Sequence, residues 1–147
     1  MVKPIGMARA LLLAAGPLLA SCAPAGSADA GAAALTPKQA EILQKHLGGK
    51  VAGELVRCLP NFRTNETIRV SDNILLYRSG STVYRNELRG ACPGLARSGD
   101  IMVIRQYGSS TCSGDVFHLV DHSSGIRGPT CMLGDFVPYR KAAKDGG

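Results

Sequence analysis

The sequence predicts a small β-rich α+β domain: a curled antiparallel sheet or barrel of five to six strands, with an N-terminal helix and two disulfides. Three observations predict this fold class. A capped helical segment comes first, short runs of β-branched and aromatic residues separated by turn residues follow it, and four cysteines are spread over the same region.

Residues 36–47 carry the signals of a helix start. Thr36 is a suitable N-cap, Pro37 occupies the first helical position, and Gln39 completes a capping box. The apolar residues of one helical face are Ile42, Leu43 and Leu47. After the interruption at Gly48 and Gly49, we expect a further turn or two of helix. That turn runs through Val51, Leu55 and Val56.

Six later runs predict strands. They are ETIRV (66–70), ILLYR (74–78), TVYRNEL (82–88), IMVIRQY (101–107), VFHLVDH (116–122) and CMLGDFVPY (131–139). The second and third runs form a hairpin around the loop SGS, and the fourth and fifth form another. The segment SSGIRGPT predicts a loop. Pro138 indicates that the last strand lies at a sheet edge or ends there.

Two of these runs are apolar on both sides. In the fourth run Ile101 and Val103 alternate with Met102 and Ile104, and the fifth run repeats the pattern. The residues of that fifth run are Val116, Val120, Phe117 and Leu119. A strand that is apolar on both faces must be covered on both. The pattern therefore favours a closed or strongly curled sheet with the helix over one opening.

The four cysteines of the domain, Cys58, Cys92, Cys112 and Cys131, predict two disulfides. A zinc site is disfavoured because such sites use cysteines two to four residues apart. Three pairings are open. We prefer Cys92–Cys112 nested inside Cys58–Cys131, since the outer bridge would then clamp the last strand to the start of the sheet.

The first 21 residues predict a secretory signal, with Lys3 and Arg9 ahead of a short apolar core. The core is too short to span a bilayer. LASC, ending at Cys22, resembles the lipobox of bacterial lipoproteins. In that class the cysteine becomes the first residue of the mature chain and carries three acyl chains of the palmitate type. The alternative is ordinary cleavage after Ala30, giving a soluble periplasmic protein.

The remaining chain divides by composition. Residues 22–34 are rich in Ala, Gly and Ser and predict a flexible tether, 35–140 form the single domain, and 141–147 predict a frayed tail. Of 17 basic residues, Lys3 and Arg9 leave with the signal, so 15 remain against 11 acidic ones, a net charge of +4. The basic residues are scattered, which disfavours nucleic-acid binding.

Candidate chemistry is sparse. His118 and His122 have the even spacing that puts two strand residues on one face, and they are the two candidate metal ligands, with no third ligand evident. Four aspartates neighbour turn residues, which explains them as backbone hydrogen-bond acceptors: Asp72, Asp100, Asp115 and Asp135. The sequence contains no nucleophile elbow, phosphate loop or dinucleotide motif, so we expect no catalytic residue and no cofactor.

An ordered set of motifs suggests a family. These motifs are CLP at 58–60, TIRVSDN at 67–73, YRNEL at 84–88, CPG at 92–94, Cys112 before Asp115, and C-x-L-G-x-F at 131–136. This pattern resembles a family of small exported proteins of Gram-negative bacteria, classed as a domain of unknown function. The resemblance implies export and disulfides and adds no catalytic residue.

Together these features predict a lipoprotein on the periplasmic side of the outer membrane. We expect a non-enzymatic structural or interaction module. Its partners are the membrane, through the lipid on Cys22, and an envelope protein whose identity the sequence leaves open. The alternative is a periplasmic module that binds a small ligand or a metal ion.

Overall fold

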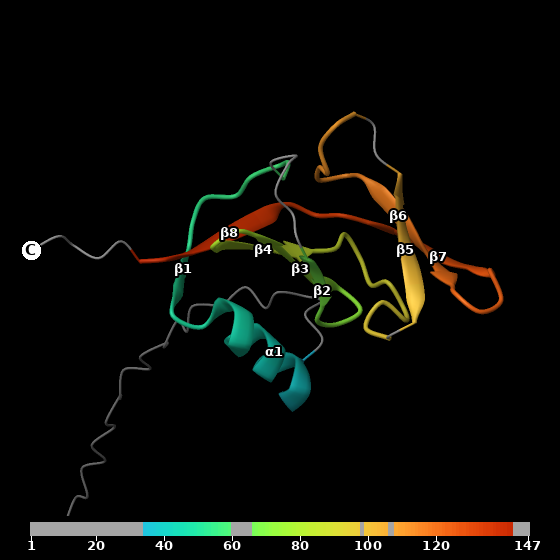
Figure 1. The fold of residues 1–147 in the computed structure, drawn as a ribbon, viewed down its shortest axis with the longest axis horizontal. Coiled ribbons are helices and arrows are strands. Elements are labelled where there is room, and N and C mark those ends of the chain that lie inside the picture. The colour runs from blue at the N-terminus through green and yellow to red at the C-terminus, as the bar shows by residue number, and fades with distance from the viewer. Residues whose placement is uncertain (1–33, 60–65, 98, 106–107, 143–147) are drawn as a thin grey trace, which may run out of the picture. The chain divides into compact units, whose positions relative to one another are not determined.

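The computed structural model describes residues 34–59, 66–97, 99–105 and 108–142 of the 147-residue chain. The chain divides into Met1–Ala32 and Ala33–Gly147, and the description below concerns the second unit. The predicted signal peptide, Cys22, Ala30, nearly all of the tether and the end of the tail lie outside the described residues. Within the described residues, one helix and eight strands follow one another (Figure 1).

Helix α1, Pro37–Leu47, begins as its sequence predicts. The Thr36 hydroxyl accepts a hydrogen bond from the Gln39 N–H, and the Gln39 side chain accepts one from the Thr36 N–H. The helix ends at Leu47, and Gly48 is its C-cap residue. The expected further helical turns are wrong. Strand β1, Lys50–Ala52, follows at once, because these residues pair with the last strand of the chain instead of bonding to one another.

The larger sheet has five antiparallel strands in the order β1-β8-β4-β3-β2. Its other members are β2 (Glu66–Arg69), β3 (Ile74–Ser79), β4 (Thr82–Glu87) and β8 (Phe136–Lys141). The predicted hairpin is confirmed as β3 and β4, joined through Gly80 at a φ of 59°. Positive φ costs glycine little, so the tight turn is available here.

Pro138 lies inside this sheet, between β1 and β4, and its placement at an edge or strand end is wrong. The reason lies in the length of β1. The Pro138 carbonyl accepts a hydrogen bond from Gly53, which is just past the last residue of β1. Because the N–H and C=O of one strand residue point to the same side, the missing N–H faces this short neighbour and leaves the β4 side intact.

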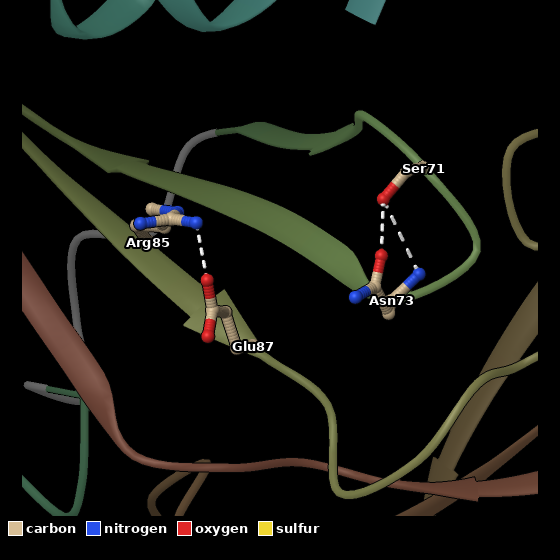
Figure 2. Close-up of polar contacts among 4 residues, drawn as sticks. All are labelled: Ser71, Asn73, Arg85 and Glu87. Atoms are coloured by element: carbon tan, nitrogen blue, oxygen red, sulfur yellow. Dashed lines mark hydrogen bonds and ion pairs between the residues drawn. The ribbon is translucent and has the colours of Figure 1, made fainter. Parts of the chain in front are cut away.

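The turn between β2 and β3 is the predicted SDN turn. The Ser71 hydroxyl donates to the side-chain oxygen of Asn73 at 2.6 Å and accepts from its backbone N–H at 3.4 Å (Figure 2). On the adjacent strand β4, Arg85 and Glu87 form an ion pair on one face (Figure 2). These short polar contacts are local, so they stabilise the strand ends without adding a site.

The smaller sheet has three antiparallel strands in the order β5-β6-β7 (Figure 1). They are β5 (Asp100–Arg105), β6 (Val116–Asp121) and β7 (Arg127–Met132). The second predicted hairpin is confirmed as β5 and β6. Strand β7 begins inside the segment that was predicted to be a loop. Its glycine and proline hide the strand pattern, but its backbone still pairs with β6 from Val116 to Val120.

The five-stranded sheet is covered on both faces. Ile74 and Leu76 of β3 belong to a cluster against which the apolar face of α1 packs. Leu75 and Tyr77, which alternate with them, belong to the main core together with Phe117 and other residues of the smaller sheet. Alternate residues of a strand point to opposite faces, so the run ILLYR serves both clusters.

The β-rich α+β class, the N-terminal helix, the antiparallel sheets and two disulfides are thus confirmed. A single curled sheet or closed barrel of five to six strands is not what forms. In the described part of the chain, eight strands make two open sheets, because the segment after β4 leaves the first sheet and β5 pairs with β6 alone. Local patterns predict strands but carry little information about which strands pair.

The disulfides join Cys58 to Cys112 and Cys92 to Cys131. The preferred pairing of Cys58 with Cys131 and Cys92 with Cys112 is therefore wrong. Cys58 and Cys112 face each other in an isolated antiparallel bridge, held on either side by backbone hydrogen bonds. Cys131 instead lies in β7 beside Phe117, where the buried Cys92 reaches it.

Candidate functional site: the outer face of the three-stranded sheet

The three-stranded sheet buries only one of its faces. On β5, Met102 and Ile104 pack against the main core, whereas Ile101 and Val103 are 54% and 41% exposed. We call the exposed side the outer face. Its residues, taken from the strand register, are Ile101, Val103, Arg105, Val116, His118, Val120, Arg127, Thr130 and Met132.

The register places these side chains in rows across the sheet. One row joins Val103, His118 and Thr130, and the next joins Arg105, Val116 and Met132. Directly opposite side chains in antiparallel strands lie close enough to contact each other. The aliphatic residues therefore form one continuous patch, with His118 at its centre.

This face corrects an expectation from the sequence. The two runs that are apolar on both sides, now β5 and β6, were predicted to be covered on both faces, but it is the larger sheet that is covered twice. In the smaller sheet no described element covers the second face, and Met132 and Ile101 remain exposed. An aliphatic patch left open on a small domain is typical of an interaction site, whereas scattered single exposed residues are ordinary.

The charges on the outer face have one sign. Arg105 and Arg127 lie at opposite ends of the patch, and no carboxylate occupies an outer-face position in the described strands. Aspartates close to these strands are engaged elsewhere or point to the other side. Asp100 lies opposite Asp121 in the register, and the alternation of the strands places both on the core-facing side of the sheet. The outer face is therefore aliphatic with a positive margin.

The two candidate metal ligands do not come together as predicted. His118 lies in the middle of β6, while β6 ends at Asp121 and leaves His122 in the following exposed turn. Among the described residues, no three His, Cys, Asp or Glu side chains are placed to hold a metal ion. His118 is better described as part of the apolar patch.

Two neighbouring aspartates stabilise turns: Asp115, as predicted, and Asp121, which was expected to be a strand residue only. Asp121 accepts hydrogen bonds from the N–H and hydroxyl groups of Ser123 and Ser124. These bonds, the one from the Ser123 hydroxyl foremost, hold the pKa of Asp121 well below its usual range. Asp115 is buried and accepts from the Cys112 N–H at 2.7 Å, which closes the turn ahead of β6.

A groove of about 400 Å³ lies where β5 begins. Its lining residues are Thr67, Arg69, Ala96, Arg97, Gly99 and Asp100. Arg69 of β2 crosses to the start of β5 and donates to the carbonyl oxygens of Arg97 at 3.2 Å and Asp100 at 2.7 Å. These acceptors are uncharged, so the contacts position the guanidinium without neutralising it. Sequence reasoning missed this groove because its walls are about 30 residues apart in the chain.

Two further findings bear on function. No helix among the described residues is long and apolar enough to cross a membrane. Comparison of the chain with protein-family models, curated proteins and solved structures finds no match.

Proposed function

We propose that this protein is a lipid-anchored lipoprotein of the bacterial cell envelope and acts as a non-enzymatic interaction module. The observation that carries the interaction role is the uncovered outer face with its aliphatic residues and arginine margin. The outer face is suited to contact with another molecule, because burial of aliphatic side chains is favourable and these side chains have no group for acid–base chemistry.

The proposed location depends on the sequence. A signal-like segment ends at Cys22 in a lipobox-like context, and the resemblance to small exported Gram-negative proteins points to the same compartment. Two disulfides within one small domain are in keeping with an oxidising compartment such as the periplasm. An anchor at Cys22 would hold the module at the periplasmic surface of the outer membrane, where its outer face is available to envelope proteins.

A second candidate function is suggested by the groove at the start of β5. Arg69 and Arg97 line it together with the Thr67 hydroxyl, a set that suits a small anionic ligand. The groove is open and its one carboxylate, from Asp100, opposes such a ligand. The outer face carries no carboxylate within the described strands, and we therefore place the interaction role first.

Mass spectrometry of the intact chain from isolated membranes tests the anchor. We expect a chain that begins at Cys22 and carries three acyl chains. A soluble chain that begins at Gly31 would contradict the anchor and support cleavage after Ala30.

Photo-crosslinking in intact cells tests the interaction role. A photoreactive residue at Val116 or Met132, both on the outer face, should give a discrete crosslinked product. The matched control replaces Lys38 or Glu41, exposed residues of α1, and should give none. Equal crosslinking from both surfaces, or none from either, would contradict the proposal.

A further inference from the structure

We propose that β5 is a docking edge for an extended acidic peptide segment of a partner, which adds to the three-stranded sheet as a fourth strand. This inference deepens the proposed interaction role and rests on it. It names the mode of binding, through backbone hydrogen bonds at a sheet edge, and the chemistry of the partner, alternating aliphatic residues with acidic ends.

The hydrogen-bond pattern shows which groups of β5 are free. Asp121 of β6 exchanges its backbone bonds with Ile126 and Gly125, on the β7 side. Asp100, which lies opposite Asp121 in the register, therefore forms no backbone hydrogen bond with β6. The Asp100 carbonyl points away from β6 and accepts a hydrogen bond from Arg69. Alternate residues of a strand repeat this direction, so the N–H and C=O groups of Met102 and Ile104 also point outward. Among the described residues, these groups have no hydrogen-bond partner.

The other strand edges are less suited to pairing. Strand β1 has three residues, and β7 contains Pro129 and faces a register irregularity in β6. Short length, proline and irregularity are the usual features that prevent edge pairing. Strand β5 has six residues, no proline and no irregularity in its register with β6. Strand β2 has four residues, and the guanidinium of its Arg69 donates a hydrogen bond to Asp100 at the start of β5.

The side chains beside this edge define the partner. An added strand that pairs with Met102 and Ile104 places its intervening side chains next to Ile101 and Val103 on the outer face. Aliphatic side chains at those positions would extend the existing patch and bury both residues. The partner strand therefore needs aliphatic residues at every second position.

The charges favour an acidic partner. Arg97 and Arg69 line the groove at one end of β5, and Arg105 lies at the other end. No ion pair joins any of these three arginines to a carboxylate within the described part of the chain. A second copy of this protein would bring the same arginines to the contact. An acidic segment would instead pair with them at both ends. The three arginines outnumber the one carboxylate that lines the groove, that of Asp100, and this is why we favour an acidic segment.

A designed peptide tests the inference. The probe is acetyl-Glu-Glu-Val-Thr-Val-Thr-Val-Glu-Glu-amide, carrying a fluorophore for polarisation measurements with the purified, oxidised full chain. Amide NMR shifts on the labelled chain locate the binding site. We expect saturable binding, with the largest shifts at Met102 and Ile104. Shifts confined to other strands would overturn the proposal.

Two altered probes separate the contribution of backbone pairing from that of charge. N-methylation of the two threonines removes the donors that face Met102 and Ile104, and should abolish binding. Lysine in place of every glutamate should weaken binding, because the arginines then repel the peptide. Equal binding of all three peptides would overturn strand addition and the acidic preference together.

Variants of the chain give the matching test. Val103→Lys should weaken binding about tenfold, since an aliphatic contact beside the edge is lost. Ala40→Lys, at an exposed position of α1, adds the same charge away from the outer face and is the control, which should bind as the unmodified chain does. Arg97→Gln and Arg105→Gln should each weaken binding about two- to fivefold, the range for exposed ion pairs. Arg140→Gln on β8 should leave it unchanged.

The outcome also distinguishes this inference from the proposed function. If outer-face crosslinks form in cells but the probe does not bind, strand addition is wrong and the interaction role stands. If neither is observed, both are wrong. Concentration-dependent dimers in sedimentation experiments that Val103→Lys abolishes would show that a second copy occupies β5, and would overturn the acidic segment.

Discussion

The Arg78 guanidinium of β3 lies 3.1 Å from Nδ1 of His46 on α1. A guanidinium can only donate hydrogen bonds, so Nδ1 of a neutral imidazole is the acceptor. Arg78 also pairs with Glu66 of β2 at 3.4 Å. Helix α1 is thus joined to the larger sheet by a contact that requires His46 to be uncharged. This contact lies beside the apolar packing of Leu43 and Leu47.

The first prediction is a loss of stability at mildly acidic pH. Burial, and then Arg78, lower the pKa of His46 below its usual 6.5 in the folded chain, with Lys45 and Lys50 acting the same way and Glu66 opposing. The unfolded chain then binds more protons than the folded one. Stability from this residue is complete above pH 6.5 and is lost as the pH falls from there through the folded pKa.

Denaturant unfolding of the wild type and His46→Gln between pH 5 and 7.5 checks this prediction. The wild type should lose stability toward pH 5 relative to the variant, because glutamine does not titrate. Hydrogen exchange should show faster opening of α1 at the lower pH in the wild type alone. Parallel pH profiles for the two chains would contradict the role of His46.

The second prediction concerns Tyr77, whose hydroxyl is buried in the main core without a hydrogen-bond partner in the described structure. Burial, with a smaller effect of Asp115, raises the pKa of this phenol. Its ring packs edge-on against Phe136 at a centroid distance of 5.7 Å, a contact that Phe would keep. Tyr77→Phe removes only the unpaired hydroxyl, so stability should be unchanged or rise by about 1 kcal/mol.

Thermal or denaturant unfolding of Tyr77→Phe measures this change. Tyr77→Leu is the comparison, because it also removes the ring contact and should destabilise the domain. A loss of more than about 1 kcal/mol in the phenylalanine variant would mean that the hydroxyl is hydrogen-bonded in solution.

The third prediction concerns the close approach of two strands at Gly134. The fully buried Asn86 donates to the Gly134 and Asp135 carbonyls and accepts from the Gly134 N–H, which holds the entry to β8 against β4. A Cβ at Gly134 would overlap the carbonyl oxygen of Glu87. Because backbone cannot give way cheaply, Gly134→Ala should cost about 3 kcal/mol.

Gly128 offers a matched control within β7. A Cβ there would meet the Leu119 carbonyl oxygen at 3.4 Å, and Gly128→Ala should change stability by less than about 1 kcal/mol. Equilibrium unfolding of the two variants under one condition gives the comparison. Equal stabilities would contradict the close packing of β8 against β4.

The fourth prediction concerns the order in which the disulfides are reduced. Cys58 is exposed, whereas Cys92 and Cys131 are buried at 0% and 7% exposure. A thiolate must reach a sulfur atom to attack it, so mild reductant should open Cys58–Cys112 first. Each disulfide closes a long loop, and removal of either should cost on the order of 4 kcal/mol under the chain-entropy model.

Alkylation of the native chain during a time course of reduction, followed by peptide mass spectrometry, identifies the order. Cys58→Ser with Cys112→Ser, and Cys92→Ser with Cys131→Ser, give the two stabilities. Simultaneous reduction of both bridges would mean that the domain unfolds before either is attacked.

Local sequence features predicted local structure well. The capping box of Thr36 and Gln39 fixed the start of α1, and the turn residues located two hairpins. The glycine and proline of β7 and the brevity of β1 concealed those strands, because their pairing depends on neighbours far along the chain. The outer face could be read as apolar from alternation alone, but nothing in the pattern said that it would be left uncovered.

The sequence by itself determined the β-rich class, the helix, and the four cysteines that form the disulfides, since these follow from side-chain spacing and backbone preference. Only the tertiary structure decided that Cys58 bonds to Cys112, that eight strands divide into two sheets, and that Arg69 reaches the start of β5. These features depend on which segments meet in space. The free energy that favours one arrangement is a sum over contacts between residues tens of positions apart, which local patterns do not contain.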